Sequence, residues 1–212
     1  MEKKTLKARI IETSLVMFEQ HGYHGVTVDQ IVEKCGTSKG GFYHNFKSKD
    51  ELLYHIHDVF ISYVLDRAKE AYANYSTPVS QLCAMILSFT KVFDLYKPYI
   101  TVFYQESTYL KDHFQEKING KREEYRQIIL RVIEEGQESG EFRSEVSAEI
   151  ATMAIMGMVN WTYKWFKKEG ELSIENIGEI FNDLLIHALV TEKGMANQET
   201  PFYLLKSQSI KK

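Results

Sequence analysis

The chain contains little cysteine and little proline, with two and three residues respectively among 212. Cys35 and Cys83 are too few and too far apart for a disulfide framework or a thiolate metal site, which suits a reducing cytosol. No stretch approaches the roughly 20 uninterrupted apolar residues of a membrane span, and the N-terminus lacks the apolar run of a signal peptide. We therefore expect a cytoplasmic protein with no membrane association and no metal site.

The chain also has no large excess of charge of one sign. Its 26 basic and 29 acidic side chains give a formal net charge of -3, so the overall balance does not indicate nucleic-acid binding. The distribution is uneven, because residues 1–49 hold eight Lys or Arg and five Asp or Glu, whereas residues 50–212 hold 18 and 24. A basic N-terminal segment therefore precedes an acidic body.

Strand-type alternation of apolar and polar residues is hard to find, whereas apolar residues recur at three-and-four spacing along most of the chain. This pattern predicts an all-α fold. About nine helices are expected, at about residues 4–21, 27–36, 39–45, 48–72, 78–97, 98–111, 115–138, 148–168 and 174–192.

Two of the short predicted helices are separated by Gly36 and Thr37, as in a helix-turn-helix, where glycine supplies the backbone conformation of the turn. In that arrangement the second helix would enter the major groove of DNA. Polar side chains that can contact DNA follow the turn, namely Ser38, Lys39, Tyr43, His44 and Lys49. The spacing alone is equally compatible with a small helical hairpin that has a solvated charged face.

Residues 27–52, TVDQIVEKCGTSKGGFYHNFKSKDEL, resemble the DNA-binding signature of the TetR family of repressors. The preceding residues 18–23, FEQHGY, and the layout of nine helices are also similar to that family. The resemblance implies a three-helix helix-turn-helix domain at residues 1–47 and an effector-binding and dimerisation domain at residues 48–194. We expect the tail, residues 195–212, to be loosely ordered.

The resemblance implies a set of DNA-contacting positions in and around the turn. These are Thr27, Thr37, Ser38, Lys39, Gly41, Tyr43, His44 and Lys49. Gly41 departs from the family pattern, because many members use a side chain there to contact bases. Gly40 and Gly41 each disfavour the helix by roughly 1 kcal/mol relative to alanine, so we expect the recognition helix to be easily remodelled on DNA.

A single recognition helix rarely supplies enough affinity, so we expect a homodimer on a palindromic operator in double-stranded DNA. The resemblance implies that the eighth and ninth helices pair with their counterparts as a four-helix bundle. Gly157 would allow close backbone approach on a face opposite Trp161 and Trp165. Periodicity also allows these faces to be covered within one chain.

Aromatic residues crowd the segment from Phe89 to Tyr109 and can line a cavity between helices, although an aromatic stripe is more often plain core. Basic residues of the seventh helix can hold an anionic head group, or they form a solvated face balanced by glutamates. The candidate effector-binding residues are Phe89, Phe93, Tyr99, Phe103, Tyr104, Arg122, Arg126, Trp161 and Trp165.

The rings and the basic cluster together favour a large amphipathic effector. Residues 136–143 and the two tryptophans are similar to family members that regulate fatty-acid degradation and release DNA on binding long-chain acyl-CoA. We therefore expect long-chain acyl-CoA as the effector, and no cofactor. The alternative is a repressor of the same family that answers to another hydrophobic ligand, such as a drug or signalling molecule, and controls a transporter.

An enzyme is not expected. His55 and His57 are two residues apart and would point about 200° away from each other on a helix, so they cannot share a metal ion. The chain has no glycine-rich phosphate loop and no nucleophile motif. A purely structural helical bundle would explain the helices but not the basic segment with its pair of capped short helices.

Overall fold

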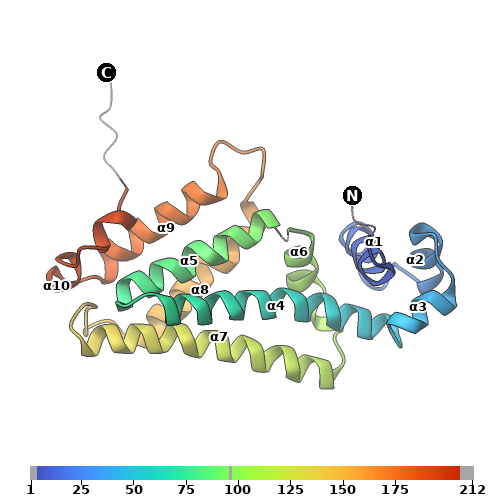
Figure 1. The fold of residues 1–212 in the computed structure, drawn as a ribbon, viewed down its shortest axis with the longest axis horizontal. Helices are drawn as coiled ribbons and strands as arrows, with labels where there is room; N and C mark the ends of the chain where they lie inside the picture. The colour runs from blue at the N-terminus through green and yellow to red at the C-terminus, as the bar shows by residue number, and fades with distance from the viewer. Residues whose placement is uncertain (1–3, 96, 206–212) are drawn as a thin grey trace. The chain divides into compact units, whose positions relative to one another are not determined.

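The computed structural model describes residues 4–95 and 97–205, and these form helices with no β-strand, which confirms the predicted all-α class. In chain order the helices are α1 (Leu6–His21), α2 (Val28–Cys35), α3 (Lys39–Asn45), α4 (Lys49–Asn74), α5 (Pro78–Leu95), α6 (Lys97–Gln105), the 3₁₀ helix η1 (Ser107–Tyr109), α7 (Asp112–Glu138), α8 (Ala148–Trp165), α9 (Ile174–Leu189), α10 (Glu192–Met195) and the 3₁₀ helix η2 (Thr200–Tyr203) (Figure 1). In this part of the chain no helix is by itself long and apolar enough to cross a bilayer, and the bent pair Pro78–Phe93 and Pro98–Gln105 meets that criterion in length and composition alone.

The nine expected helices are all present, and three of them end at least three residues earlier than predicted. The sixth ends at Gln105, because the chain tightens into η1 after Glu106. The eighth ends at Trp165, and the ninth ends at Leu189, where Val190 adopts an extended conformation. Within the tail, α10 and η2 are helical, whereas residues 206–212 lie outside the described residues.

The chain divides into two compact units. The first holds Met1–Tyr63 and Tyr96–Lys121, and the second holds Val64–Leu95 and Arg122–Lys212. The helix α4 therefore contributes its first part to the first unit and its last part to the second. The first unit therefore extends beyond residue 47, where we expected the DNA-binding domain to end. The expected domain boundary stays a prediction.

In the first unit α1 packs against α2, α3 and α6. The apolar side chains that fill this core are buried, among them Ile10, Phe18, Ile31, Phe42, Phe46, Leu52 and Ile56. Burial of side chains of this size supplies roughly 1.5 to 3 kcal/mol each, which is what holds helices as short as α2 and α3 in place. The core therefore fixes the two short helices that follow α1.

In the second unit α9 lies along α5 (Figure 1). Gly178 makes the close approach possible, because a β-carbon there would lie 2.7 Å from Thr90 Oγ1 and 3.1 Å from Leu87 Cδ2. Buried polar groups also join the two helices, since Asn182 Nδ2 donates a hydrogen bond to the carbonyl oxygen of Cys83 at 3.3 Å. The two helices are therefore held at a fixed separation.

The connection between α7 and α8 is fastened to the end of α9. Phe142 pairs with Val190 in an isolated antiparallel bridge, and the Arg143 amide donates to Leu189 O at 2.9 Å. The ring of Phe142 packs directly on the backbone of Gly136, so closely that a β-carbon at Gly136 would overlap the ring. The stretch 136–143, which carries part of the family resemblance, therefore has a packing role within this unit.

The α7 glycines allow a matched test of this packing. We expect Gly136→Ala to lower the free energy of unfolding by about 1 to 3 kcal/mol, because the added methyl group overpacks against Phe142. Gly120→Ala, with no atom within 4 Å of the new β-carbon, should raise it by about 0.5 to 1 kcal/mol through helix propensity. Urea unfolding followed by circular dichroism measures both, and equal effects at the two positions would contradict the packing account.

Candidate DNA-binding interface and effector site

The helices α2 and α3 are each started by a side-chain cap. Thr27 Oγ1 accepts a hydrogen bond from the Gln30 amide at 3.3 Å, while Gln30 Oε1 accepts one from the Thr27 amide at 2.8 Å. Ser38 Oγ accepts one from the Gly41 amide at 3.1 Å. Between the caps, Gly36 has φ +65°, a left-handed conformation that other residues adopt at a cost. The local sequence therefore produces the predicted helix-turn-helix.

The polar side chains expected to contact DNA lie mainly on the outside of this motif. Exposed side chains among them are Thr27, Ser38, Lys39, Tyr43 and His44, and Thr37 is half-buried. Lys39 Nζ lies 2.7 Å from Asp29 Oδ1, and this hydrogen bond raises the pKa of Lys39. Both partners are largely exposed, so the ion pair is weak and the ammonium stays available to a phosphate.

The two glycines of α3 have different surroundings. A β-carbon at Gly41 would lie 2.5 Å from Thr37 Oγ1 and 3.3 Å from Leu6 Cδ2, whereas one at Gly40 would meet nothing closer than Ser38 Oγ at 3.6 Å. The missing side chain at Gly41, which departs from the family pattern, thus lets α3 pack closely on the turn and on α1. Gly40 has no comparable packing reason.

Lys49 takes a different position from the other candidate DNA contacts. Its ammonium donates hydrogen bonds to Tyr23 O at 2.9 Å and Val26 O at 2.6 Å, and it lies 4.1 Å from the centre of the Tyr23 ring. Burial lowers the pKa of Lys49, and the neighbouring Asp50 partly opposes this. In this structure the side chain fastens the α1–α2 turn, so its contact with a phosphate stays a prediction.

Tyr23 is the centre of a group of hydrogen bonds that the sequence analysis did not identify. Its hydroxyl donates to Asp50 Oδ1 at 2.7 Å, and its backbone amide donates to Glu106 Oε2 at 3.2 Å. Asp50 also pairs with Lys111 at 2.7 Å. We call these residues, together with Lys49, the Tyr23 clamp. It joins the α1–α2 turn to the start of α4 and to the segment that follows α6.

The electrostatics of the Tyr23 clamp follow from burial and pairing. Burial and the hydrogen bond to Asp50 both raise the pKa of the Tyr23 hydroxyl. Burial alone would raise the pKa of the Asp50 carboxyl, but the hydrogen bonds from Lys111 and Tyr23 outweigh it and hold that pKa below its ordinary value. Tyr23 therefore stays a neutral donor and Asp50 a charged acceptor near pH 7. No local pattern in the sequence marks Glu106, because its partner is 83 residues away.

The predicted effector-binding rings fall into separate groups. In the second unit Phe89 and Phe93 are buried with ring centres 5.9 Å apart, Phe89 stacks on Tyr125, and Phe93 contacts Phe166. Trp161 and Trp165 do not join this group, because they are 61% and 46% exposed on α8.

The remaining predicted rings belong to the first unit. Phe103 is buried, and its ring centre lies 4.5 Å from that of Phe60, 5.3 Å from that of Tyr104 and 5.2 Å from that of His57. Tyr99 and Tyr104 are half-buried. The rings of Phe60, Phe103, Tyr104 and His57 form a cluster of side chains from α4 and α6.

The two predicted arginines are half-buried on α7. Arg126 makes two hydrogen bonds to Glu123, at 2.9 and 2.6 Å, and this pairing lowers the pKa of Glu123 to about 2. If Arg126 binds the anionic head group of an effector, as predicted, its guanidinium group has to leave the carboxylate of Glu123.

The outer faces of α8 and α9 carry apolar side chains that the second unit leaves uncovered. The exposed large residues on them are Ile150, Met153, Trp161, Trp165 and Leu184. A β-carbon at Gly157 would have no atom within 4 Å, and Gly157 precedes Trp161 by four residues, so both lie on this exposed face. The expectation that Gly157 faces away from the tryptophans was wrong, because residues four apart share one side of a helix.

Two family models match the chain. The model for bacterial regulatory proteins of the tetR family matches residues 10–56, and the model for the tetracyclin repressor-like C-terminal domain matches residues 75–189. The second match alone covers more than half of the chain. Together they span the helix-turn-helix and most of the helices after it.

Relatives from bacteria match along most of their length. The transcriptional repressor KstR2 of Mycolicibacterium smegmatis is 20% identical over 87% of this chain and 91% of its own. The fatty acid metabolism regulator protein of Bacillus subtilis is 21% identical over 89% of this chain and 97% of its own. The solved structure of AibR with isovaleryl coenzyme A and operator DNA superposes with a TM-score of 0.76 at 22% identity, covering 85% of this chain and 97% of that one.

The hydroxyl of Tyr23 is the simplest part of the clamp to remove. We expect Tyr23→Phe to lower the free energy of unfolding by about 1 to 3 kcal/mol, because it removes a hydrogen bond to a charged acceptor and leaves the ring in place. Tyr109→Phe is the control, since Tyr109 is 41% exposed and stacks on Tyr23 through its ring. Urea unfolding of both variants measures the change in the free energy of unfolding. An equal decrease in the two variants would contradict the claim that the hydrogen bond from Tyr23 to Asp50 stabilises the fold.

Proposed function

Because the chain belongs to the TetR family of ligand-responsive transcriptional repressors, we propose that it binds a palindromic operator as a dimer and leaves it when a hydrophobic effector binds. The observation that carries the proposal is the capped helix-turn-helix, which exposes an ammonium and a hydroxyl at the start of α3 and a tyrosine ring further along it. The family is one of DNA-binding regulators and not of enzymes.

In this proposal α3 lies in the major groove of double-stranded DNA. Ser38 and Lys39 at its first turn approach the bases and phosphates, while Tyr43 and His44 contact the backbone. Thr27 and Thr37 flank the helix, and Gly41 allows close approach of its backbone. Lys49 reaches a phosphate only if it leaves the carbonyl oxygens of the α1–α2 turn. We assign residues 1–47 to DNA binding and residues 48–194 to effector binding and dimerisation.

We assign the dimer contact to α8 and α9. Their outer faces expose several large apolar side chains, which is unfavourable in water and typical of a surface that a partner covers. The open space at Gly157 supports this assignment, because a second helix can approach the backbone there. A second copy of the chain also supplies the second recognition helix that a palindromic operator requires.

The effector we propose is a long-chain acyl-CoA. Two relatives support the choice by name, a fatty acid metabolism regulator and AibR, whose structure contains isovaleryl coenzyme A. Considered unit by unit, the candidate contacts of the acyl chain are Tyr99, Phe103 and Tyr104 in the first unit and Phe89 and Phe93 in the second, and those of the anionic head group are Arg122 and Arg126. The exposed Trp161 and Trp165 belong to the proposed dimer face instead. The apolar rings suit a hydrocarbon chain, and the guanidinium groups suit phosphates.

Signal transmission would run through α4 and the Tyr23 clamp. The helix α4 begins directly after α3, and its Asp50 holds the Tyr23 hydroxyl. Glu106, just after α6, accepts a hydrogen bond from the Tyr23 amide. A ligand that moves α6 or α4 would therefore displace the α1–α2 turn. Only the difference in the ligand's affinity for the two arrangements can shift DNA binding, so DNA and effector weaken each other reciprocally.

The ion pair of Lys39 and Asp29 allows a test of DNA contact in both directions. We expect Lys39→Ala to weaken binding by at least about tenfold and to lower the salt dependence, because a phosphate contact is lost in each half-site. Asp29→Asn should strengthen binding, since it releases Lys39 and removes a negative charge. Fluorescence anisotropy on an operator selected from random DNA measures both. Lys69→Ala, whose partner is Glu124, is the control, and unchanged binding by Lys39→Ala would contradict the proposal.

The effector is tested by thermal unfolding of the full chain with acyl-CoAs of graded chain length, free fatty acids and free CoA. We expect long acyl-CoAs to raise the unfolding midpoint with concentration and to release the operator, and free CoA to do neither. Arg126→Gln should weaken acyl-CoA more than free fatty acid, because only the first carries the phosphates. If another hydrophobic compound acts and acyl-CoAs do not, the repressor assignment stands, and the alternative of a drug or signalling ligand with control of a transporter replaces this one.

A further inference from the structure

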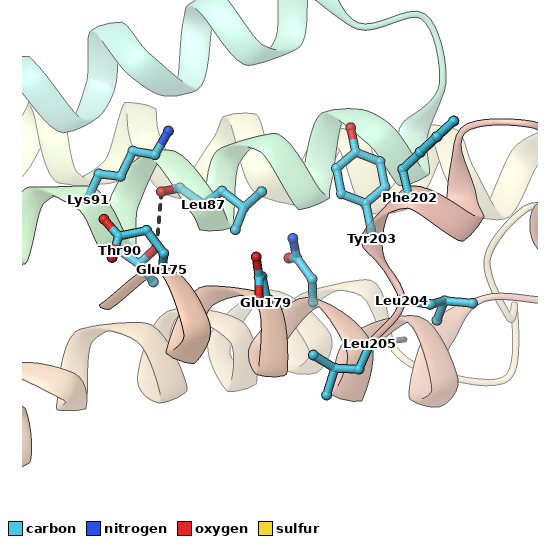
Figure 2. Close-up of a pocket in the computed structure, with 10 residues that line it drawn as sticks. Leu87, Thr90, Lys91, Glu175, Glu179, Phe202, Tyr203, Leu204 and Leu205 are labelled. Carbon is cyan, nitrogen blue, oxygen red and sulfur yellow. Dashed lines mark hydrogen bonds between the residues drawn. The ribbon is translucent and has the colours of Figure 1, made fainter. Parts of the chain in front are cut away.

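A groove opens between α5, α9 and the C-terminal strap, residues 202–205. It has a volume of about 650 Å³, in the range of small-molecule sites. Figure 2 shows Lys91 and Glu175 toward one end, Phe202, Tyr203, Leu204 and Leu205 toward the other, and Glu179 between them. The groove lies wholly within the second unit and contains none of the residues assigned above to DNA or to the acyl-CoA.

The middle of the groove is acidic. Glu175 and Glu179 are four residues apart and lie on one side of α9, and neither carboxylate has an ion-pair partner among the described residues. Lys91 lies at the end that Glu175 occupies, so it offsets that charge more than the charge of Glu179 (Figure 2). Glu179, in the middle of the groove, is therefore a carboxylate whose charge Lys91 compensates less.

A buried acceptor without a partner lies beside these carboxylates. Asn182 lines the groove and is 1% exposed. Its Nδ2 donates to Cys83 O, which fixes the orientation of the amide, and its Oδ1 makes no hydrogen bond to any described residue. A buried unpaired carbonyl oxygen is unfavourable unless a donor is supplied from outside, and an N–H group is such a donor.

The other half of the groove is aromatic and apolar. Phe202 is 84% exposed, which is unusual for a phenylalanine, and Tyr203 lies beside it. Burial raises the pKa of Tyr203 to about 12, so its ring is neutral near pH 7. The strap is held in place, because the Leu205 amide donates to Asp183 Oδ1 at 2.9 Å. Aromatic faces attract both apolar groups and cations.

We propose that this groove binds a protonated amine that carries an aromatic or apolar group. The ammonium would donate to Glu179 and to Asn182 Oδ1, and the apolar group would lie on Phe202, Tyr203 and Leu87. An anion is disfavoured, because the two carboxylates Glu175 and Glu179 outnumber the one ammonium, Lys91, in the lining of the groove. A neutral ligand would leave the carboxylate of Glu179 without a counter-charge. The site is separate from the proposed acyl-CoA site and adds a second ligand class to the protein.

Three phenylalkyl probes whose head groups are cationic, neutral and anionic test the proposal, namely 4-phenylbutylamine, 4-phenylbutan-1-ol and 4-phenylbutyrate. Isothermal titration on the full chain without DNA should show the amine bound at least about tenfold more tightly than the alcohol, and the carboxylate unbound. Glu179→Gln and Phe202→Ala should each weaken the amine by about tenfold, and Lys91→Gln should strengthen it by a few-fold.

Glu134→Gln on α7 is the matched control, because Glu134 is exposed and lies outside the groove. Thermal unfolding midpoints of all variants verify that they fold, since the substituted groove side chains Glu179, Lys91 and Phe202 are exposed. Equal affinity for the three probes would overturn the proposal. So would an amine that binds all groove variants as it binds the control, because it would then occupy another site. Operator binding enters none of these measurements, so a failure of the repressor proposal would be seen separately.

Discussion

The hydrogen bonds of Tyr23 are the interaction on which the arrangement of the DNA-binding helices depends. Tyr23 is buried in the turn between α1 and α2, and both its hydroxyl and its backbone amide end on carboxylates, those of Asp50 and Glu106. A bond from a buried donor to a charged acceptor is strong, and the loss of either partner leaves an unpaired polar group in the interior. The short helices α2 and α3 are too small to hold a position by themselves, so the clamp and the core behind it decide where they lie.

Two needs compete at the surface of the DNA-binding unit. Stability favours pairing each charge within the chain, as with Lys49 on the carbonyl oxygens of the turn and Lys39 on Asp29. DNA binding requires ammonium groups that can be given to phosphates. Lys49 is half-buried on the carbonyl oxygens of the turn, whereas Lys39 lies in an exposed ion pair that is easily exchanged.

The second unit shows the same division between closed and open surfaces. Its interior is held by the close contact of α5 with α9 at Gly178 and by the overlap of Phe142 with Gly136. Its exterior keeps large apolar side chains on α8 and a groove with an unpaired amide oxygen on Asn182. An exposed apolar face and an unpaired buried oxygen both destabilise an isolated chain, and each is explained if a partner or a ligand covers it. This is the physical reason for the dimer and for the amine site proposed above.

Much of this protein was determined by its sequence alone, because the causes are local. Caps at Thr27 and Ser38, the glycine at Gly36 and three-and-four spacing act over a few residues, so the helices and the helix-turn-helix could be predicted. Tertiary structure alone decided the rest, because Tyr23 with Glu106 and the lining of the groove join residues far apart in the chain. Periodicity shows that a helix has an apolar face but not what covers it, so the exposed side of α8 became visible only once the second unit was packed.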